Sequence, residues 1–380
     1  MKKNNSITIA IVHPNQNAYS ETFIRSHIDN LPCKVIEFDG GIFPRRTRSA
    51  DIFNLNSKTL NVSRIVRIFL QKQKEYPYFF SKLIKKIFQY YKVDAVLAEY
   101  GPTGEKILPV CRELNIPLIV HFHGFDAHRR STIEEYGNYK HIFSEAAAVI
   151  GVSQKMCEQL KTLGCPEIKL HYIVYGIGDI FFNQRLPENT LPKLVCIGRF
   201  TPKKAPYFTV MAFAKAVKSV PEARLIMIGT GTELIDVCWQ MTKMYGIEDK
   251  VHFVGVKSPD EIAQILSTSR AFIQHSVEAM DGNSEGTPVA VLEACAVGVP
   301  VISTFHAGIS DVVIHEKTGL LVGERDIEGM AKNMVRVLEN EPFARQMGQE
   351  AKKHMQQNYR SEISIKKLWD VIYGTIRKDE

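Results

Sequence analysis

Short apolar runs alternate along this chain with segments whose apolar residues recur at helical spacing. The runs are rich in β-branched residues and hold few polar positions, a pattern typical of strands in parallel sheets that helices cover on both faces. One helical segment holds Phe23, Ile24, His27, Ile28 and Leu31. Strands are expected at residues 7–12, 35–38, 95–99, 117–122, 148–152 and 170–174 in the first half, and at 194–197, 224–228, 251–254, 271–274, 301–303 and 320–322 in the second.

The two halves are separated by a polar stretch, residues 183–192, which contains two prolines and no hydrophobic periodicity. We expect a first domain over residues 1–182 and a second over residues 193–358, each an α/β unit with its own parallel sheet. A helix start is predicted at Ser258-Pro259-Asp260-Glu261, which has the pattern of a capping box. Ligands of open parallel sheets bind at the carboxyl ends of the strands. The functional site is therefore expected in a cleft between the domains.

Composition places the chain among ordinary globular proteins. It has 380 residues, of which 45% are hydrophobic and 23% are charged. No window reaches the roughly 18 apolar residues of a membrane span, and the apolar run near the start is too short for the core of a signal peptide. The seven cysteines are scattered and form no Cys-x-x-Cys pair, which favours buried free thiols in a reducing compartment. Together these features predict a cytoplasmic protein.

Positive charge is concentrated between residues 45 and 92. This segment holds twelve Lys or Arg residues and two acids, Asp51 and Glu75, within a chain of net charge +7. A local basic surface predicts an anionic partner. The last part of the segment interleaves lysines with apolar and aromatic residues, which suits peripheral binding to the anionic inner face of the plasma membrane. A helix packed on its own sheet with solvated lysines explains the pattern equally well, and no motif supports binding of nucleic acid.

A basic loop follows the first expected strand of the second domain. Its sequence is Gly198-Arg199-Phe200-Thr201-Pro202-Lys203-Lys204. Arg199 offers a bidentate fork and Lys204 a point charge, and the two can converge on a diphosphate from the carboxyl end of the strand. A solvated basic loop is the alternative, and the loop alone does not decide between them.

A second candidate lies where a helix is expected to begin in the second domain. Thr287 is a good N-cap and Pro288 a good first residue for a helix that ends near Val297. The free N–H groups and the positive dipole of its first turn form a natural anion seat. Glu285, just before the cap, and Glu293, inside the helix, would then accept hydrogen bonds from the hydroxyls of a sugar or a ribose.

Two histidines and an aspartate end an apolar strand of the first domain. Alternation along the strand puts His121 and His123 on one face. Only Asp126 adds a further ligand at suitable spacing, so no metal site is expected. His123 is expected to hydrogen-bond a substrate in the cleft, with a structural histidine as the alternative.

A glycine-rich turn follows the strand at residues 224–228. Gly229 and Gly231 match the start of a dinucleotide fingerprint, but Leu234 stands in place of the third glycine, and no acid follows the next strand. A nicotinamide cofactor is therefore not expected, although the turn is compatible with a nucleotide beside it.

Taken together, these motifs resemble glycosyltransferase family 4, whose members have the GT-B fold of two Rossmann-like domains. The resemblance is most specific in the second domain, where four motifs follow in order: Gly-Arg-x-x-x-Lys-Lys at 198–204, Glu-x7-Glu at 285–293, Ala-Val-Gly-Val-Pro-Val-Ile at 296–302 and Thr-Gly-Leu-Leu-Val at 318–322. In the first domain, residues 20–24 and 123–126 resemble the acceptor-side elements of the family. Residues 123–130 and 281–288 resemble bacterial members that build capsule or exopolysaccharide.

The resemblance implies a catalytic set of His123, Arg199, Lys204 and Glu285. In the family, the arginine and the lysine hold the donor diphosphate and stabilise the leaving group without a metal ion. The glutamate addresses the donor sugar, and the histidine lies near the reacting centre. Gly198 belongs to the same donor-binding loop.

Further donor contacts are implied for Gly286, Thr287, Val289, Glu293 and Val256. The main-chain N–H groups of the first two would address the donor sugar. Glu293 would accept hydrogen bonds from the ribose, and the base would lie near Val256. No cofactor other than the nucleotide sugar itself is implied.

The acceptor side is implied to include Ser20, Glu21, Tyr100 and Asp126. A C-terminal helix within residues 359–380 would cross back onto the first domain. The implied activity is a retaining hexosyl transfer from a nucleotide diphosphate sugar to a glycan or a lipid-linked oligosaccharide in bacterial surface polysaccharide biosynthesis. A sugar-nucleotide epimerase on the same fold and a non-catalytic, membrane-associated scaffold are the alternatives.

Overall fold

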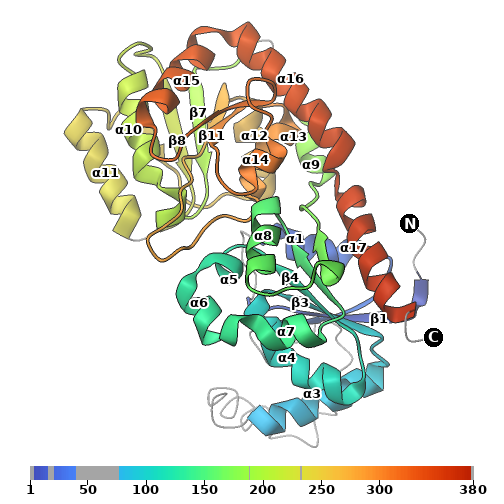
Figure 1. The fold of residues 1–380 in the computed structure, drawn as a ribbon. Helices are drawn as coiled ribbons and strands as arrows, with labels where there is room; N and C mark the ends of the chain where they lie inside the picture. The colour runs from blue at the N-terminus through green and yellow to red at the C-terminus, as the bar shows by residue number, and fades with distance from the viewer. Residues whose placement is uncertain (1–3, 16–20, 40–76, 188, 232, 378–380) are drawn as a thin grey trace, which may run out of the picture.

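The computed structural model describes residues 4–15, 21–39, 77–187, 189–231 and 233–377, which form two domains with a six-stranded parallel sheet in each (Figure 1). The expected fold class is confirmed. All twelve expected strands are present, with bounds that differ from the expected ones by no more than three residues. Ser20 and residues 45–76 of the basic segment lie outside the described residues.

The first sheet is built from six strands of the first domain. They are β1 (Asn4–Val12), β2 (Cys33–Phe38), β3 (Ala95–Glu99), β4 (Leu118–Phe122), β5 (Ala148–Gly151) and β6 (Leu170–Tyr172). Their order across the sheet is β2-β1-β3-β4-β5-β6, with all neighbours parallel. Every residue of β3, β4 and β5 is buried, which explains their continuous apolar sequences. In this register, Glu99 at the end of β3 pairs with His121 of β4.

The second sheet repeats this design. Its strands are β7 (Lys193–Ile197), β8 (Arg224–Ile228), β9 (Val251–Phe253), β10 (Ala271–Ile273), β11 (Val301–Thr304) and β12 (Gly319–Val322). Their order is β12-β11-β10-β7-β8-β9, again parallel throughout. Since β7 and β10 are central neighbours, the loops that follow them leave the sheet side by side.

Helices flank both sheets. Those of the first domain are α1 (Thr22–Asn30), α3 (Pro77–Tyr91), α4 (Gly101–Leu114), α5 (Phe125–His128), α6 (Arg130–Glu135), α7 (Lys140–Glu145), α8 (Gln154–Thr162) and α9 (Asp179–Phe182). Those that follow are α10 (Pro206–Ala216), α11 (Glu233–Tyr245), α12 (Pro259–Ser267), α13 (Val289–Val297), α14 (Ile309–Val312), α15 (Ile327–Glu339), α16 (Glu341–Asn358) and α17 (Ser361–Ile376).

The two predicted helix starts have different outcomes. Ser258 caps α12 in a complete capping box with Glu261, as expected. The prediction that Thr287 caps α13 is wrong, because the N-cap is Pro288, with φ −64° and ψ 119°. The Thr287 hydroxyl instead donates to the carbonyl of Val152 in the first domain, at 2.6 Å. A long-range hydrogen bond has taken the place of the local cap.

The C-terminal helix returns to the first domain. After α16, the chain pairs with the first domain through a bridge between Ile177 and Arg360, and α17 then runs along the first sheet (Figure 1). Leu368 and Trp369 of α17 join a core cluster with Ile9 and Ile11 of β1. Burial of these side chains ties the two ends of the chain into one structure.

No helix in the described part of the chain is both long and apolar enough to cross a bilayer. All seven cysteines are free thiols, as expected, and five of them are buried. Burial raises the pKa of thiols such as Cys111 and Cys295 to about 12, which makes them unreactive.

Candidate functional site

Loops at the carboxyl ends of the two sheets meet in a contact that we call the seam. It joins residues 123–124 and 152 of the first domain to residues 284–287 of the second. A Cβ on Gly286 would lie 2.3 Å from the carbonyl oxygen of His123, so only glycine permits this approach. The seam lies where the sequence predicted the functional site.

The basic loop after β7 reaches this region from the second domain. Gly198 has a φ of 151°, and a Cβ there would lie 2.8 Å from Cδ of Lys204. Glycine thus lets the lysine fold back toward the end of the strand. Arg199 is exposed, whereas Lys203 is buried. A small pocket is lined by Gly198, Arg199, Lys204 and Gln274.

Glu285 is buried and held by two lysines. Its Oε1 lies 2.9 Å from Nζ of Lys204, and its Oε2 lies 3.3 Å from Nζ of Lys203. Burial by itself raises the pKa of Glu285, but the two ammonium groups outweigh this effect and hold the pKa well below its ordinary range. Lys203 also donates to the carbonyl of Ser284 at 2.9 Å. With Arg199, the loop carries more positive than negative charge, which suits an anionic ligand.

His306 anchors the loop that carries Glu285. Its Nε2 accepts the main-chain N–H of Glu285 at 3.2 Å and lies 3.0 Å from the hydroxyl of Ser284. Because Nε2 is an acceptor, Nδ1 carries the proton and donates to Glu324 at 2.6 Å. Burial raises the pKa of Glu324, but the hydrogen bond from His306 contributes to lowering it to about 2. The carboxylate therefore remains ionised and fixes the histidine.

On the first-domain side, Asp126 shapes the turn that enters the seam. Its carboxylate accepts main-chain N–H groups from Gly101 at 3.0 Å, His123 at 3.0 Å and Gly124 at 2.8 Å. Burial raises the pKa of Asp126, and these hydrogen bonds oppose that shift. Asp126, which is expected on the acceptor side, thus uses its carboxylate oxygens to accept hydrogen bonds from the protein main chain.

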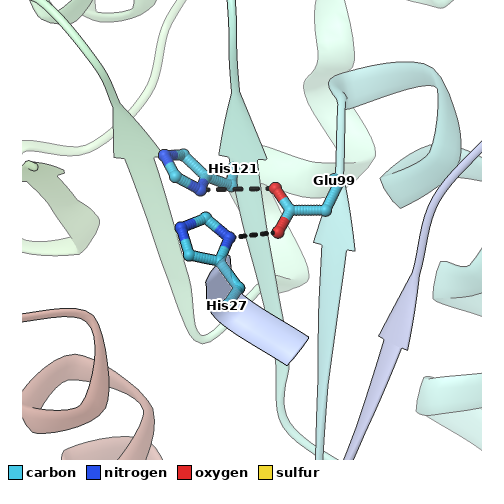
Figure 2. Close-up of side chains that lie close together, drawn as sticks. All are labelled: His27, Glu99 and His121. Carbon is cyan, nitrogen blue, oxygen red and sulfur yellow. Dashed lines mark hydrogen bonds and ion pairs between the residues drawn. The ribbon is translucent and has the colours of Figure 1, made fainter. Parts of the chain in front are cut away.

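His123 lies in a buried cluster behind this turn. Its Nε2 is 2.7 Å from Oε2 of Glu99, and its Nδ1 is 2.7 Å from the hydroxyl of Tyr175. His27 of α1 contacts the other oxygen of Glu99 at 2.7 Å, and His121 approaches Oε2 to 3.3 Å (Figure 2). The two strand histidines do share one face, as expected. A contact between the His123 ring and a substrate would require one of its two hydrogen bonds to be exchanged.

The same cluster contains a possible ligand set for a metal. His27, Glu99 and His121 each offer one atom, and these atoms lie within 4.8 Å of one another. Imidazole and carboxylate suit several transition metals. However, the contacts of Glu99 with His27 and His123 have hydrogen-bond lengths of 2.7 Å, whereas the ligand atoms of a tetrahedral zinc site lie about 3.3 Å apart. Hydrogen bonding therefore explains the contacts of Glu99 with His27 and His123 without an ion, whereas neither ring nitrogen of the buried His121 has a hydrogen-bond partner among the residues that the structure describes.

The remaining residues expected on the acceptor side lie around Glu21. Its Oε1 accepts a hydrogen bond from the hydroxyl of Tyr100 at 2.7 Å and one from the amide of Asn15 at 2.5 Å. Tyr100 also contacts the ring of His123, with centroids 4.6 Å apart. The structure thus brings Glu21 and Tyr100 together beside the seam, while Ser20 lies outside the described residues.

The residues expected to hold the nucleoside part of the donor lie on α13 and after β9. Val289 and Glu293 are one turn apart on α13, and Glu293 is buried. Burial raises the pKa of Glu293 to about 7. Val256 follows Gly255 on the loop after β9 and is 42% exposed, so its side chain is open to a ligand.

Some prominent side chains of the site were not singled out from the sequence. The sequence predicts no functional role for Lys203, Glu99 or His306, and it places His27 only in a helical pattern. The signal for Glu99 is a charged residue that closes the apolar run Ala95-Val96-Leu97-Ala98. A carboxylate in a strand buried on both faces requires a partner.

Two family models match this chain in sequence. Residues 179–354 match the model described as glycosyl transferases group 1, and residues 41–178 match the model described as glycosyltransferase family 4. The two matches are adjacent and together run from residue 41 to residue 354.

Similar proteins come from bacterial polysaccharide pathways. The chain is 29% identical over 256 residues to the colanic acid biosynthesis glycosyltransferase WcaL of Escherichia coli, and the match covers 64% of this chain and 61% of that protein. It is 27% identical over 291 residues to the amylovoran biosynthesis glycosyltransferase AmsK of Erwinia amylovora, covering 74% and 70%. The chain thus spans less than two thirds of the length of the first relative.

Among solved structures, the chain is similar to Anabaena Alr3699/HepE in complex with UDP and glucose. The TM-score is 0.75 at 14% identity, and the match covers 97% of this chain and 100% of that one. At this identity, the likeness concerns the fold.

Proposed function

This chain belongs to glycosyltransferase family 4 and has the GT-B fold, and we propose that it transfers a sugar from a nucleotide diphosphate sugar to a glycan or lipid-linked acceptor in the synthesis of a bacterial surface polysaccharide. One observation carries the proposal: Lys203 and Lys204 converge on the buried carboxylate of Glu285 at the seam. Cations for a diphosphate and an acceptor for sugar hydroxyls thus lie together. The polysaccharide pathways of WcaL and AmsK suggest the product class.

In the proposed reaction, the bond between the anomeric carbon and the diphosphate breaks, and an oxygen of an acceptor hydroxyl bonds to that carbon with retention of configuration. The proton of the hydroxyl goes to the leaving diphosphate. Arg199 and Lys204 meet the charge that grows on the leaving diphosphate, and such preorganised cations stabilise the transition state electrostatically. No metal ion is needed for this role. Glu285 orients the donor sugar, His123 lies near the reacting centre, and Glu293 accepts the ribose hydroxyls.

A thermal-stability screen tests the donor class. UDP-glucose, UDP-galactose, GDP-mannose and NAD are added to the full chain in the presence of EDTA. A nucleotide sugar at 100 times its dissociation constant should stabilise the protein by about 2.7 kcal/mol, and NAD should not. Stabilisation by NAD alone, or inversion of the donor sugar at C2 without any acceptor, would contradict the proposed transfer.

The basic segment supports a lipid-linked acceptor presented at an anionic membrane. In its described part, α3 buries Ile84 and Phe88 in the core, while Lys82, Lys86 and Tyr90 are exposed. Exposed lysines beside an aromatic ring suit an anionic surface. Flotation with vesicles of phosphatidylglycerol and phosphatidylcholine should recover the protein at low salt but not at high salt. Failure to bind at low salt would rule out this membrane role.

A further inference from the structure

The ring of His123 is fixed at both of its nitrogens, and the partners define its tautomer. The ionised carboxylate of Glu99 can only accept a hydrogen bond, so Nε2 of His123 must carry the proton in their 2.7 Å contact. Nδ1 must then accept the O–H of Tyr175, also at 2.7 Å. Burial lowers the pKa of His123 to about 3 and raises that of Tyr175 well above its ordinary value, which agrees with a neutral imidazole and an intact phenol.

The carboxylate that fixes this ring is costly to bury. Glu99 is 0% exposed, and an ion removed from water costs several kcal/mol unless partners compensate it. His27 supplies one N–H to the far oxygen, and His123 supplies another to the near one. Phe23 of α1 closes the cluster, with its ring 4.5 Å from that of His123 and 4.4 Å from that of Tyr175. These contacts come from α1, β3 and the chain after β6, and together they hold the ring in one orientation.

The main chain of His123 lies on the other side of this arrangement, against the donor-side loop. Only glycine fits at position 286, since a Cβ there would lie 2.3 Å from the carbonyl oxygen of His123. A Cβ on Gly124 would lie 3.3 Å from Nζ of Lys203 and 3.4 Å from the carbonyl oxygen of Ser284. The residue whose ring is held by Glu99 and Tyr175 thus also supplies the main chain that contacts the donor-side loop.

We propose that Glu99 is a positioning residue for the transfer reaction, which acts by holding the Nε2–H tautomer of His123 and thereby the His123-Gly124 main chain against Lys203 and the loop of Glu285. The claim rests on the proposed function. Glu99 touches neither donor nor acceptor in this role. A misplacement of a catalytic loop by about 1 Å can reduce turnover about 100-fold, so a rigid anchor at this place has a direct effect on rate.

Kinetics of two matched variants test the proposal. Glu99→Gln removes the charge at the end of β3. Asp94→Asn makes the same change just before β3, where the carboxylate accepts the N–H of Thr8 at 2.7 Å, at the opposite end of the strand. For hydrolysis of UDP-glucose or GDP-mannose, whichever stabilises the protein, Glu99→Gln should lower kcat about 10- to 100-fold with little change in KM. Asp94→Asn should retain wild-type kcat. Equal kcat values in the two variants would overturn the positioning role.

A spectroscopic readout keeps the test independent of activity. With ¹⁵N-labelled histidine, His123, assigned by its loss in His123→Gln, should show a protonated Nε2 and an unprotonated Nδ1 between pH 6 and pH 9. Glu99→Gln should disturb this tautomer, and Asp94→Asn should not. An unchanged His123 spectrum in Glu99→Gln overturns the proposal, whether or not the variants are active. Inactivity of every variant would instead count against the proposed function.

Two further measurements separate the proposal from its rivals. Tyr175→Phe removes the other anchor of the ring, and its effect on kcat should be non-additive with that of Glu99→Gln because the two residues hold one side chain. Strict additivity would contradict the shared role. Metal analysis of the purified protein should find no stoichiometric ion. A bound transition metal that is lost in Glu99→Gln would show that the cluster is a metal site and would overturn the assignment.

Discussion

Nζ of Lys204 lies 2.9 Å from Oε1 of Glu285, although the two residues follow different strands of the second sheet, β7 and β10. The pairing of these strands at the centre of the sheet brings the two loops together. The lysine is therefore oriented before any ligand arrives, and it does not lose rotamer freedom when a diphosphate binds. The carboxylate in turn stays ionised and can accept hydrogen bonds from hydroxyl groups.

Replacing Lys204 or Arg199 by alanine should lower the transfer rate by about two orders of magnitude or more, the usual loss when one preorganised charge is removed from a transition state. Release of nucleoside diphosphate from the selected donor measures the effect. Lys257→Ala is the matched control, because this lysine pairs with Glu261 at the edge of α12, where both are partly exposed. Near-normal turnover in both site variants would remove these residues from the catalytic set.

Replacing His306 by phenylalanine should disturb the donor loop while keeping the side-chain volume. The main-chain N–H of Glu285 and the carboxylate of Glu324 would lose their shared partner. One unsatisfied buried group costs about 1–3 kcal/mol, so the free energy of unfolding should fall by that amount and the KM for the donor should rise. His252→Phe, on the exposed side of β9, is the control. A lower melting temperature with unchanged kinetics would show that His306 serves stability alone.

The strands could be predicted from the sequence because burial on both faces of a parallel sheet leaves a continuous apolar run. The start of α13 could not be predicted in the same way. Thr287 has the local chemistry of an N-cap, but its hydroxyl bonds Val152 across the seam. Such a contact depends on how two domains meet, and local sequence preference carries no information about that.

The residues of the candidate site differ in the same way, since those of the donor loops could be predicted and those around His123 could not. Arg199, Lys204 and Glu285 could be named because they stand in short motifs beside strand ends. Glu99, His27 and Tyr175 are spread over α1, β3 and the segment after β6, and only the sheet order brings them to His123. The apolar run before Glu99 marks this residue as a carboxylate that needs a partner, but no spacing rule links it to His27 or Tyr175.

Replacing Glu293 by glutamine should stabilise the protein in a pH-dependent way. The pKa of this buried carboxyl is about 7 in the folded protein, against an ordinary value of 4.5. The folded state therefore binds the proton more tightly than the unfolded chain, and its stability falls as the pH rises through 4.5 to 7. The variant should match the wild type near pH 4.5 and exceed it above pH 7, by about 3 kcal/mol at most. Chemical unfolding at several pH values measures this difference.

The same substitution should weaken binding of the nucleotide-sugar donor. A neutral amide accepts a hydrogen bond from a ribose hydroxyl less strongly than a carboxylate, by about 1 kcal/mol, so the affinity for the nucleotide should fall roughly 5- to 10-fold. Glu339→Gln, on the exposed end of α15, should change neither property. If Glu293→Gln raises stability above pH 7 and leaves nucleotide affinity unchanged, the carboxylate does not contact the ribose.

Replacing Gly286 by alanine should abolish turnover by forcing the seam apart. The new Cβ would lie 2.3 Å from the carbonyl oxygen of His123 and 2.6 Å from Cγ2 of Val152, both in the first domain. Because both are held by the first sheet, the domains must separate, and Lys203 would move away from Gly124. Gly374→Ala is the control, since a Cβ there meets nothing within 4 Å, and alanine favours a helix by about 1 kcal/mol. Small-angle scattering should show a larger radius of gyration for the Gly286 variant, and an unchanged radius with normal turnover would show that the seam accommodates the added methyl group without separation of the domains.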